Sequence, residues 1–206
     1  MLNRSKDYQL INNFISSIHD ELSQIYEVRN REVILKLEKI LNIFQEEKIS
    51  TSHFQSSTGI GYNDISREKI DKVFAKLFHA QKAAVRMQYV SGTHAIASVL
   101  FGILRPDEIM LSVTGSPYDT LEEVIGLRGN GQGSLKEFGV KYRQIDINHD
   151  KNYAEKIADQ INNTNCKLVF IQKSCGYTWR KSLTNEEIKK ICTLVHSINP
   201  NCICFV

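Results

Sequence analysis

The chain has 206 residues, of which 42% are hydrophobic and 24% are charged, and its formal net charge is +3. This composition is typical of a globular protein with one sizeable core. The small positive excess contains no basic block, which argues against nucleic acid or an anionic membrane as a partner. The sequence also lacks an apolar run of about 20 residues and a signal-peptide core, so it predicts a soluble, cytoplasmic protein.

Residues 5–48 repeat apolar side chains every three or four positions, which predicts two helices. These helices can pack on the main body or on a second subunit, whereas a free coiled coil is disfavoured because the heptads are few. Ser66 is the expected N-cap of a further helix. We therefore divide the chain into an N-terminal helical arm, residues 1–50, and a large domain, residues 51–206.

The large domain alternates strand-like and helix-like segments. The predicted strands are Ala84–Val90, Glu108–Val113, Tyr142–Ile147, Leu168–Gln172 and Cys202–Val206. The predicted helices are Thr93–Leu104, Pro117–Ile125, Tyr153–Ile161 and Asn185–Ile198, the last with a capping box at Thr184 and Glu187. This alternation predicts an α/β fold with a mostly parallel sheet and helices on both of its faces.

The five cysteines form no CxxC pair. Cys202 and Cys204 alternate with Ile203 and Phe205, which is typical of small apolar residues on a buried strand. We expect reduced structural thiols and no metal site.

The sequence ends at Val206, inside an apolar predicted strand without a polar tail. Open α/β sheets bind ligands at the carboxyl ends of their strands. A truncated reading frame is therefore the simpler expectation for this end.

Two segments carry candidate chemistry. Ser91, Gly92 and Thr93 join a predicted strand to an apolar helix, where free N–H groups and hydroxyls can hold a phosphate, although an ordinary helix cap has the same pattern. Tyr118 follows the next strand and can lie flat on a planar ligand, or can be a half-buried tyrosine at a helix start. The glycine-rich residues 126–133 are interpreted as a mobile loop near the same edge.

Taken together, several segments in a fixed order resemble one family. They are residues 62–67, 90–95, 117–121, 133–140 and 171–177. In this order they are similar to the methionine gamma-lyase-like proteins often labelled aluminium resistance proteins, which belong to the Cys/Met-metabolism group of pyridoxal-phosphate (PLP) enzymes of fold type I. The similarity runs from Ile11 to Val206.

The resemblance implies a partial PLP-transferase large domain of the aspartate-aminotransferase type, a homodimer, and elimination from a sulfur-containing amino acid. It implies that Ser91, Gly92 and Thr93 cradle the cofactor phosphate. Tyr118 is implied to stack on the pyridine ring and to be a candidate proton donor to the leaving group.

The neighbouring subunit is implied to complete the phosphate site, and Tyr62 and Arg67 are the candidates. Arg128 can contact substrate or be a solvated loop arginine.

Two departures from the family pattern bear on function. Relatives tend to have Arg-Ser-Arg-Gly-Tyr where this chain has Lys-Ser-Cys-Gly-Tyr at 173–177, which removes a bidentate guanidinium. The aspartate that pairs with the pyridine nitrogen and the Schiff-base lysine are implied to lie beyond Val206, yet PLP chemistry needs both.

Two hypotheses follow from these departures. The chain is a truncated PLP-dependent carbon–sulfur lyase, joined by a second copy or by a complementing C-terminal fragment, or it is a catalytically inactive fragment or assembly partner. A nucleotide-binding domain has little support, because GxxxxGK[ST] is absent.

Overall fold

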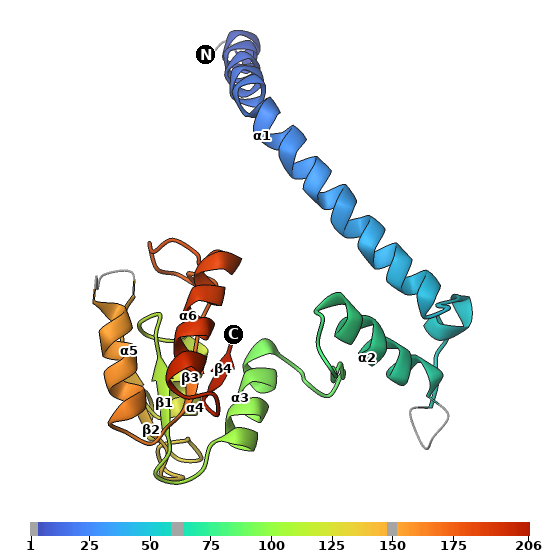
Figure 1. Cartoon of the computed structure of the whole chain (residues 1–206). Coiled ribbons are helices and arrows are strands. Elements are labelled where there is room, and N and C mark those ends of the chain that lie inside the picture. The colour runs from blue at the N-terminus through green and yellow to red at the C-terminus, as the bar shows by residue number, and fades with distance from the viewer. Residues whose placement is uncertain (1–3, 59–63, 148–151) are drawn as a thin grey trace. The chain divides into compact units, whose positions relative to one another are not determined.

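The computed structural model describes residues 4–58, 64–147 and 152–206 (Figure 1). The chain divides into two compact units, Met1–Met87 and Gln88–Val206. The described residues form six α-helices and one four-stranded sheet. Within these ranges, every helix is too short or too polar to span a bilayer. The boundary between an arm of residues 1–50 and a large domain of residues 51–206 stays a prediction.

The first unit begins with α1, a single helix from Arg4 to Glu46, so the prediction of two helices was wrong. Charged residues near position 30 interrupt the apolar pattern, but no glycine or proline lies there to end a helix. Arg29 and Glu32 instead form an ion pair one turn apart, with 3.2 Å between Nη1 and Oε2. Such a pair favours a continuous helix.

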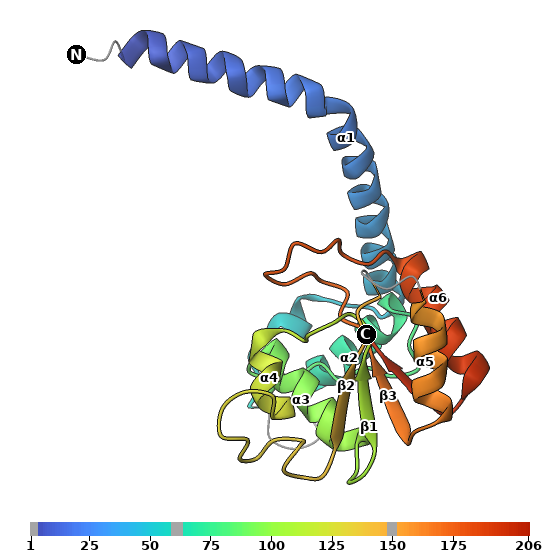
Figure 2. The ribbon, with the colours of Figure 1, turned by 90° about the vertical axis from the view of Figure 1, so that its left-hand side faces the viewer.

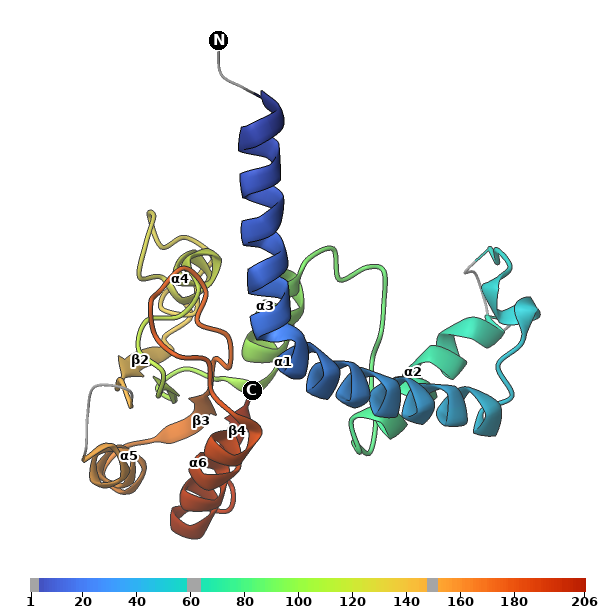
Figure 3. The same cartoon turned by 90° about the horizontal axis from the view of Figure 1, so that it is seen from above.

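The last turns of α1 pack against α2 (Ile65–Leu77), and the short 3-10 helix η1 (Thr51–Phe54) lies between the two in sequence (Figure 3). Ile43 of α1 and Val73 of α2 are buried. Glu47 pairs with Lys76 at 2.7 Å and with Lys69 at 3.3 Å. Hydrogen bonds with the two lysines, above all with Lys76, hold the pKa of the Glu47 carboxyl below its ordinary value.

Helix α2 is capped by Asp64, and the prediction of Ser66 was wrong. The Asp64 carboxylate accepts the N–H of Arg67 at 3.0 Å. Ser66 lies inside the first turn, where its hydroxyl donates to the carbonyl oxygen of His53 at 2.6 Å. Aspartate and serine are both favoured caps, so the local sequence does not choose between them.

The segment that follows α2 forms no strand at Ala84–Val90, contrary to the prediction. Asp71 of α2 accepts two hydrogen bonds from Arg86, at 2.6 and 2.7 Å, and one from the N–H of Val85 at 2.8 Å. Because a side chain satisfies this backbone donor, the segment has less need of a sheet neighbour. Arg86 also holds the pKa of Asp71 below its usual range.

The second unit is built on a parallel sheet with the strand order β2-β1-β3-β4. The strands are β1 (Ile109–Ser112), β2 (Lys141–Gln144), β3 (Cys166–Phe170) and β4 (Ile203–Phe205). Helices α3 (Gly92–Ile103) and α4 (Asp119–Ile125) cover one face, and α5 (Tyr153–Asn162) and α6 (Asn185–Ile198) cover the other (Figure 2). The predicted parallel sheet with helices on both faces is confirmed.

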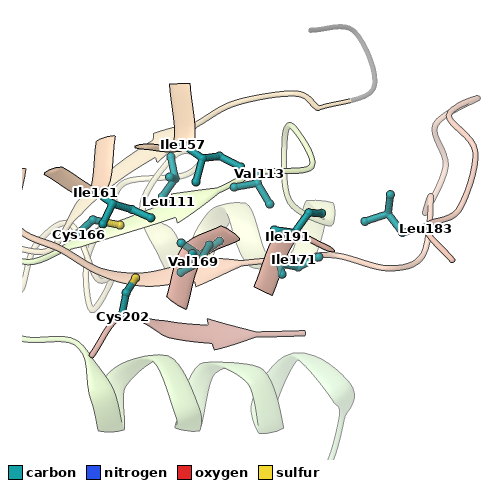
Figure 4. Packing of buried hydrophobic residues seen from close by; sticks show 11 residues of the cluster. Leu111, Val113, Ile157, Ile161, Cys166, Val169, Ile171, Leu183, Ile191 and Cys202 are labelled. Atoms are coloured by element: carbon teal, nitrogen blue, oxygen red, sulfur yellow. The ribbon is translucent and has the colours of Figure 1, made fainter. Parts of the chain in front are cut away.

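Alternate residues of β1 face the two helical layers, as the pleat requires. Leu111 and Val113 belong to the core under α5 and α6 (Figure 4), whereas Met110 belongs to the core under α3 and α4. Ser112 is buried as well, and its hydroxyl donates to the carbonyl oxygen of Gly115 at 2.7 Å. Strand β1 is therefore covered on both faces, and the hydroxyl of its last residue, Ser112, bonds to the turn that follows.

All five cysteines are free thiols. Cys202 and Cys204 face the α5–α6 core, and Ile203 and Phe205 face the α3–α4 core, so the predicted alternation is confirmed. Contact with Cys202 and burial raise the pKa of Cys166.

Candidate functional site

The candidate residues of the second unit gather where β1 and β3 end. The chain leaves β1 through residues 113–118 to reach α4, and it leaves β3 through a loop of residues 171–183 to reach α6. Carboxyl ends of parallel strands meet at one edge of a sheet, and this edge is where open α/β sheets bind ligands. Hydrogen bonds between these two connections and the start of α3 define the site.

The turn Ser91–Thr93 forms the N-terminus of α3. The Ser91 hydroxyl accepts the N–H of His94 at 3.1 Å, and the Ser91 carbonyl accepts that of Ala95 at 3.1 Å. The N–H groups of Gly92 and Thr93 lie ahead of these capping bonds, at the end of the helix that attracts anions.

Gly92 has no steric or conformational reason of its own to be glycine. It lies in the helix and outside the left-handed region, and a Cβ built on it would meet nothing within 4 Å. An alanine at this position would favour the helix. The missing side chain instead leaves open space beside the Gly92 Cα, at the end of the helix where the first N–H groups lie.

Thr93 connects this turn to the next helix. Its hydroxyl lies 2.6 Å from the hydroxyl of Thr120 in the first turn of α4. The residue two positions before Thr120 is Tyr118, which is the N-cap of α4. The N-terminus of α3 and the first turn of α4, which follows Tyr118, are therefore joined by one short hydrogen bond.

Tyr118 is half-buried and is held by its main chain. Its N–H donates to Oε1 of Gln172 at 2.8 Å, so the connection that follows β1 is bonded to the loop that follows β3. Pro117 precedes it and is buried; α4 starts only at Asp119, so the prediction that Pro117 opens the helix was wrong. Proline restricts the conformation of the residue before it and fixes its own φ, which leaves the approach to Tyr118 with little freedom.

The loop after β3 covers part of the Tyr118 ring. Gly176 has φ +58°, and a Cβ on it would lie 3.3 Å from Cδ2 of Tyr118. The ring of Tyr177 stacks on Tyr118 with 5.7 Å between centroids and 28° between planes. A hydrogen bond with Tyr177 raises the pKa of Tyr118, so the Tyr118 phenol keeps its proton at neutral pH.

The comparisons with known proteins extend over almost the whole chain. The sequence profile of the methionine gamma-lyase family matches residues 11–206. The uncharacterized protein YnbB of Bacillus subtilis strain 168 is 40% identical over 193 residues, which cover 93% of this chain and 44% of YnbB. The chain belongs to the methionine gamma-lyase family.

Solved structures are similar as well. A carbon-sulfur lyase involved in aluminum resistance from Clostridium novyi NT is 38% identical, with a TM-score of 0.88 over 100% of this chain and 51% of that protein. A Listeria monocytogenes protein, described as a candidate cystathionine beta-lyase involved in aluminum resistance, is 42% identical, with a TM-score of 0.86 over 93% of this chain and 47% of that protein. This member of the methionine gamma-lyase family thus spans about half the length of its relatives.

Two residues that were predicted to complete the phosphate site, Tyr62 and Arg67, do not belong to the second unit of this methionine gamma-lyase family member. Tyr62 lies outside the described residues. Arg67 is in the first turn of α2 in the first unit, where its Nη2 lies 3.5 Å from Oδ2 of Asp64. Their roles at a phosphate site stay predictions.

The positions that depart from the methionine gamma-lyase family pattern lie on the loop after β3. Lys173 donates to Oδ1 of Asn185 at 2.7 Å, and the Cys175 thiol is partly buried. Arg180 donates to the carbonyl oxygens of Gln172, at 2.9 Å, and Ser174. The guanidinium of Arg180 therefore closes this loop on itself. Arg128 is exposed on the glycine-rich loop after α4.

Sequence reasoning did not single out Gln172, Thr120 or Gly176 in this methionine gamma-lyase family member. Each contacts a predicted residue, but the contact joins positions far apart in the chain: Gln172 and Tyr118 are 54 residues apart. The available signal was position, because Gln172 comes directly after the buried strand β3.

Proposed function

We propose that this chain supplies the phosphate-binding turn and the ring-stacking tyrosine of a PLP-dependent carbon–sulfur lyase. The observation that carries the proposal is the hydrogen bond between Thr93 and Thr120, which joins the N-terminus of α3 to the helix that begins directly after Tyr118. Membership of the methionine gamma-lyase family supports it. The relative from Clostridium novyi is itself named a carbon-sulfur lyase.

The residues present fit the cofactor at its phosphate end. The hydroxyls of Ser91 and Thr93 and the first-turn N–H groups of Gly92 and Thr93 offer donors to a phosphate, and the α3 dipole favours its charge. The open space beside the Gly92 Cα lets the group approach the main chain closely.

The residues also fit the ring of the cofactor. Tyr118 is partly exposed, and because Tyr177 stacks on one face of its ring, a planar ligand would stack on the other face. When bound, PLP withdraws electrons from the α-carbon of an amino acid, which permits loss of a β- or γ-sulfur group. The protonated Tyr118 phenol is then a suitable proton donor to the departing sulfur.

The proposal is tested by comparing PLP with pyridoxal, which lacks the phosphate, in equilibrium dialysis against the 206-residue chain. We expect PLP to bind at least about tenfold more tightly, since the turn recognises the phosphate. Ser91→Ala should weaken PLP binding and also remove the helix cap. Thr184→Ala, which removes the cap of α6, is its matched control and should leave PLP binding unchanged. Equal binding of PLP and pyridoxal would refute the phosphate-binding turn.

We further propose that these 206 residues have no lyase activity by themselves. PLP-dependent elimination needs a lysine that binds the cofactor covalently. On the loop after β3, Lys173 is tied to Asn185 at the start of α6, and Lys181 is exposed. Incubation of the chain with PLP and L-cysteine or an S-alkyl cysteine should release no keto acid or thiol above a protein-free control. Steady turnover by the chain would contradict this proposal.

A second copy of the chain is the partner that we propose. Helix α1 carries large apolar side chains that are at least 39% exposed along its first six turns, namely Tyr8, Ile11, Phe14, Ile15, Ile18 and Ile25. An apolar stripe of this kind favours helix–helix contact. Ile15→Glu should lower the mass found by light scattering, whereas Ser16→Glu, next to the stripe, should not. A monomer in both wild type and variant would contradict the proposal.

A further inference from the structure

Gln172 occupies a central place among the hydrogen bonds of the site. Its main-chain N–H donates to the hydroxyl of the buried Thr114 at 3.2 Å, which fixes the start of the loop after β3. Its carbonyl oxygen accepts from Arg180 at 2.9 Å. The side-chain amide donates through Nε2 to the carbonyl oxygen of Ser174 at 3.2 Å. The main-chain N–H, the carbonyl oxygen and Nε2 of Gln172 therefore all bond within or beside the loop after β3, which fixes the position of the side chain.

The fourth group is Oε1, which accepts the N–H of Tyr118 at 2.8 Å. Only an acceptor can face this N–H, and the bond from Nε2 to Ser174 fixes the amide in the orientation that presents one. Tyr118 lies outside the first hydrogen-bonded turn of α4, so its N–H has no helical partner. Gln172 thus satisfies the donor of the residue whose side chain forms the aromatic part of the site.

The same segment also reaches the ring of Tyr118. Gly176 lies against Cδ2, and Tyr177 stacks on the ring. On the other side, α4 is bonded to the turn of α3 through Thr93 and Thr120. Two bonds, one at Thr120 and one at Tyr118, therefore set how far the aromatic ring lies from the N-terminus of α3.

We propose that Gln172 is a positioning residue, which holds the Tyr118 ring at a fixed spacing from the Ser91–Thr93 turn. This inference rests on the proposed function, because the spacing matters for a rigid ligand that carries both a ring and a phosphate. Such a ligand must satisfy both ends at once, whereas inorganic phosphate needs only the turn. Loss of Gln172 should therefore weaken binding of PLP and leave binding of inorganic phosphate unchanged.

Three variants of the full chain separate the contributions. Gln172→Leu removes the acceptor and the donor. Gln172→Glu keeps an acceptor for the N–H of Tyr118 and loses only the donor to Ser174, so it is the conservative rescue. Gln144→Leu is the matched control, because Gln144 also accepts a side-chain hydrogen bond, from Tyr142 at 2.9 Å, but on the edge strand β2. Thermal unfolding checks that all three remain folded.

The first readout is binding of PLP and of inorganic phosphate, measured by ³¹P NMR. For Gln172→Leu we expect the Kd for PLP to rise about tenfold or more, as for loss of one well-placed hydrogen bond, with less than about a twofold change for inorganic phosphate. Gln172→Glu should recover most of the PLP affinity, and Gln144→Leu should match the wild type. An equal loss for both probes, or no loss for PLP, would overturn the positioning role.

The second readout needs no cofactor. Amide hydrogen exchange of the Tyr118 N–H should become at least about tenfold faster in Gln172→Leu and stay close to wild type in Gln172→Glu. If the wild-type chain binds no PLP while this exchange still responds as expected, the proposed function fails and the positioning of Tyr118 stands. Unchanged exchange in Gln172→Leu would overturn the inference whatever the binding result.

Discussion

Substitution of Gly92 by alanine should make the second unit more stable and should weaken PLP binding at the proposed phosphate-binding turn. A Cβ at Gly92 meets nothing within 4 Å in the chain, so it introduces no clash into the fold. Alanine is favoured over glycine by about 1 kcal/mol in a helix interior and by less at the first helical residue, and replacing a glycine also reduces the entropy of the unfolded chain. We expect a gain of about 0.4–1 kcal/mol in the free energy of unfolding, which corresponds to about 2–4 °C in Tm.

The same methyl group would occupy the open space beside the Gly92 Cα. A phosphate held there would be pushed away from its donors, and a loss of about 1.4 kcal/mol in binding would appear as a tenfold rise in the Kd for PLP. Gly102→Ala is the control, since Gly102 is in the same helix and a Cβ there also meets nothing within 4 Å. It should raise the stability and leave PLP binding unchanged.

The assay pairs urea unfolding with equilibrium dialysis against PLP and against inorganic phosphate. Opposite signs for stability and binding in Gly92→Ala, with a change in stability alone for Gly102→Ala, are the expected pattern. Wild-type affinity in Gly92→Ala would show that the turn is an ordinary helix cap. A parallel loss of stability and binding would show instead that Gly92 is needed by the fold.

Three further changes test other parts of the structure. Arg86 depresses the pKa of Asp71, so the contribution of this pair to the free energy of unfolding is fully present above about pH 4 and is lost as the pH falls through the folded pKa. Circular dichroism of Asp71→Asn should therefore show a smaller acid-induced loss of helix than the wild type. Identical acid profiles would contradict this. Tyr177→Phe should return the raised pKa of Tyr118 toward about 10, which NMR of ¹³C-tyrosine can follow, and an unchanged titration would disprove their hydrogen bond. Leu100→Ala, at a fully buried position of α3, should lower the free energy of unfolding by about 2–5 kcal/mol in urea, and a loss below about 1 kcal/mol would indicate a site that can collapse.

The regular elements of the second unit were predictable because local and tertiary preferences agree there. Helix α6 begins at Asn185 and ends at Ile198 as predicted, since the capping box of Thr184 and Glu187 forms as the sequence indicates. The buried strands were recognisable as short apolar runs, which is the pattern of a parallel sheet covered on both faces.

The misplaced elements depend on contacts that no local pattern contains. The segment at Ala84–Val90 has strand-like composition, but Asp71 takes the N–H of Val85 and the guanidinium of Arg86. The arm contains two apolar patterns, yet nothing between them stops the helix, so α1 runs through both. In each case the pattern was correct and the inference about backbone geometry was wrong.

The candidate site, like the fold, could be predicted in part from the sequence. Tyr118 and the Ser91–Thr93 turn could be chosen from residue type and from position at strand ends, and Thr93 and Thr120 bring them together. The roles of Gln172 and Gly176 could not be predicted, because a glutamine or a glycine after a strand does not by itself indicate a contact with Tyr118. Their importance comes from where the chain folds back on Tyr118.

The buried hydroxyl of Ser112 has a consequence for how the site is assembled. A slip of one residue in the pairing of β1 would turn the Ser112 side chain toward the apolar layer of α5 and α6, and it would remove the bond from the Gly115 N–H to the carbonyl oxygen of Ile145, which is 2.9 Å long. An unsatisfied buried polar group costs about 1–3 kcal/mol, a large part of the stability of a domain this size. Gly115 lies three residues before Tyr118, so an error in strand pairing would also displace the aromatic ring. A mispaired β1 would therefore disturb the sheet core and the position of Tyr118 together.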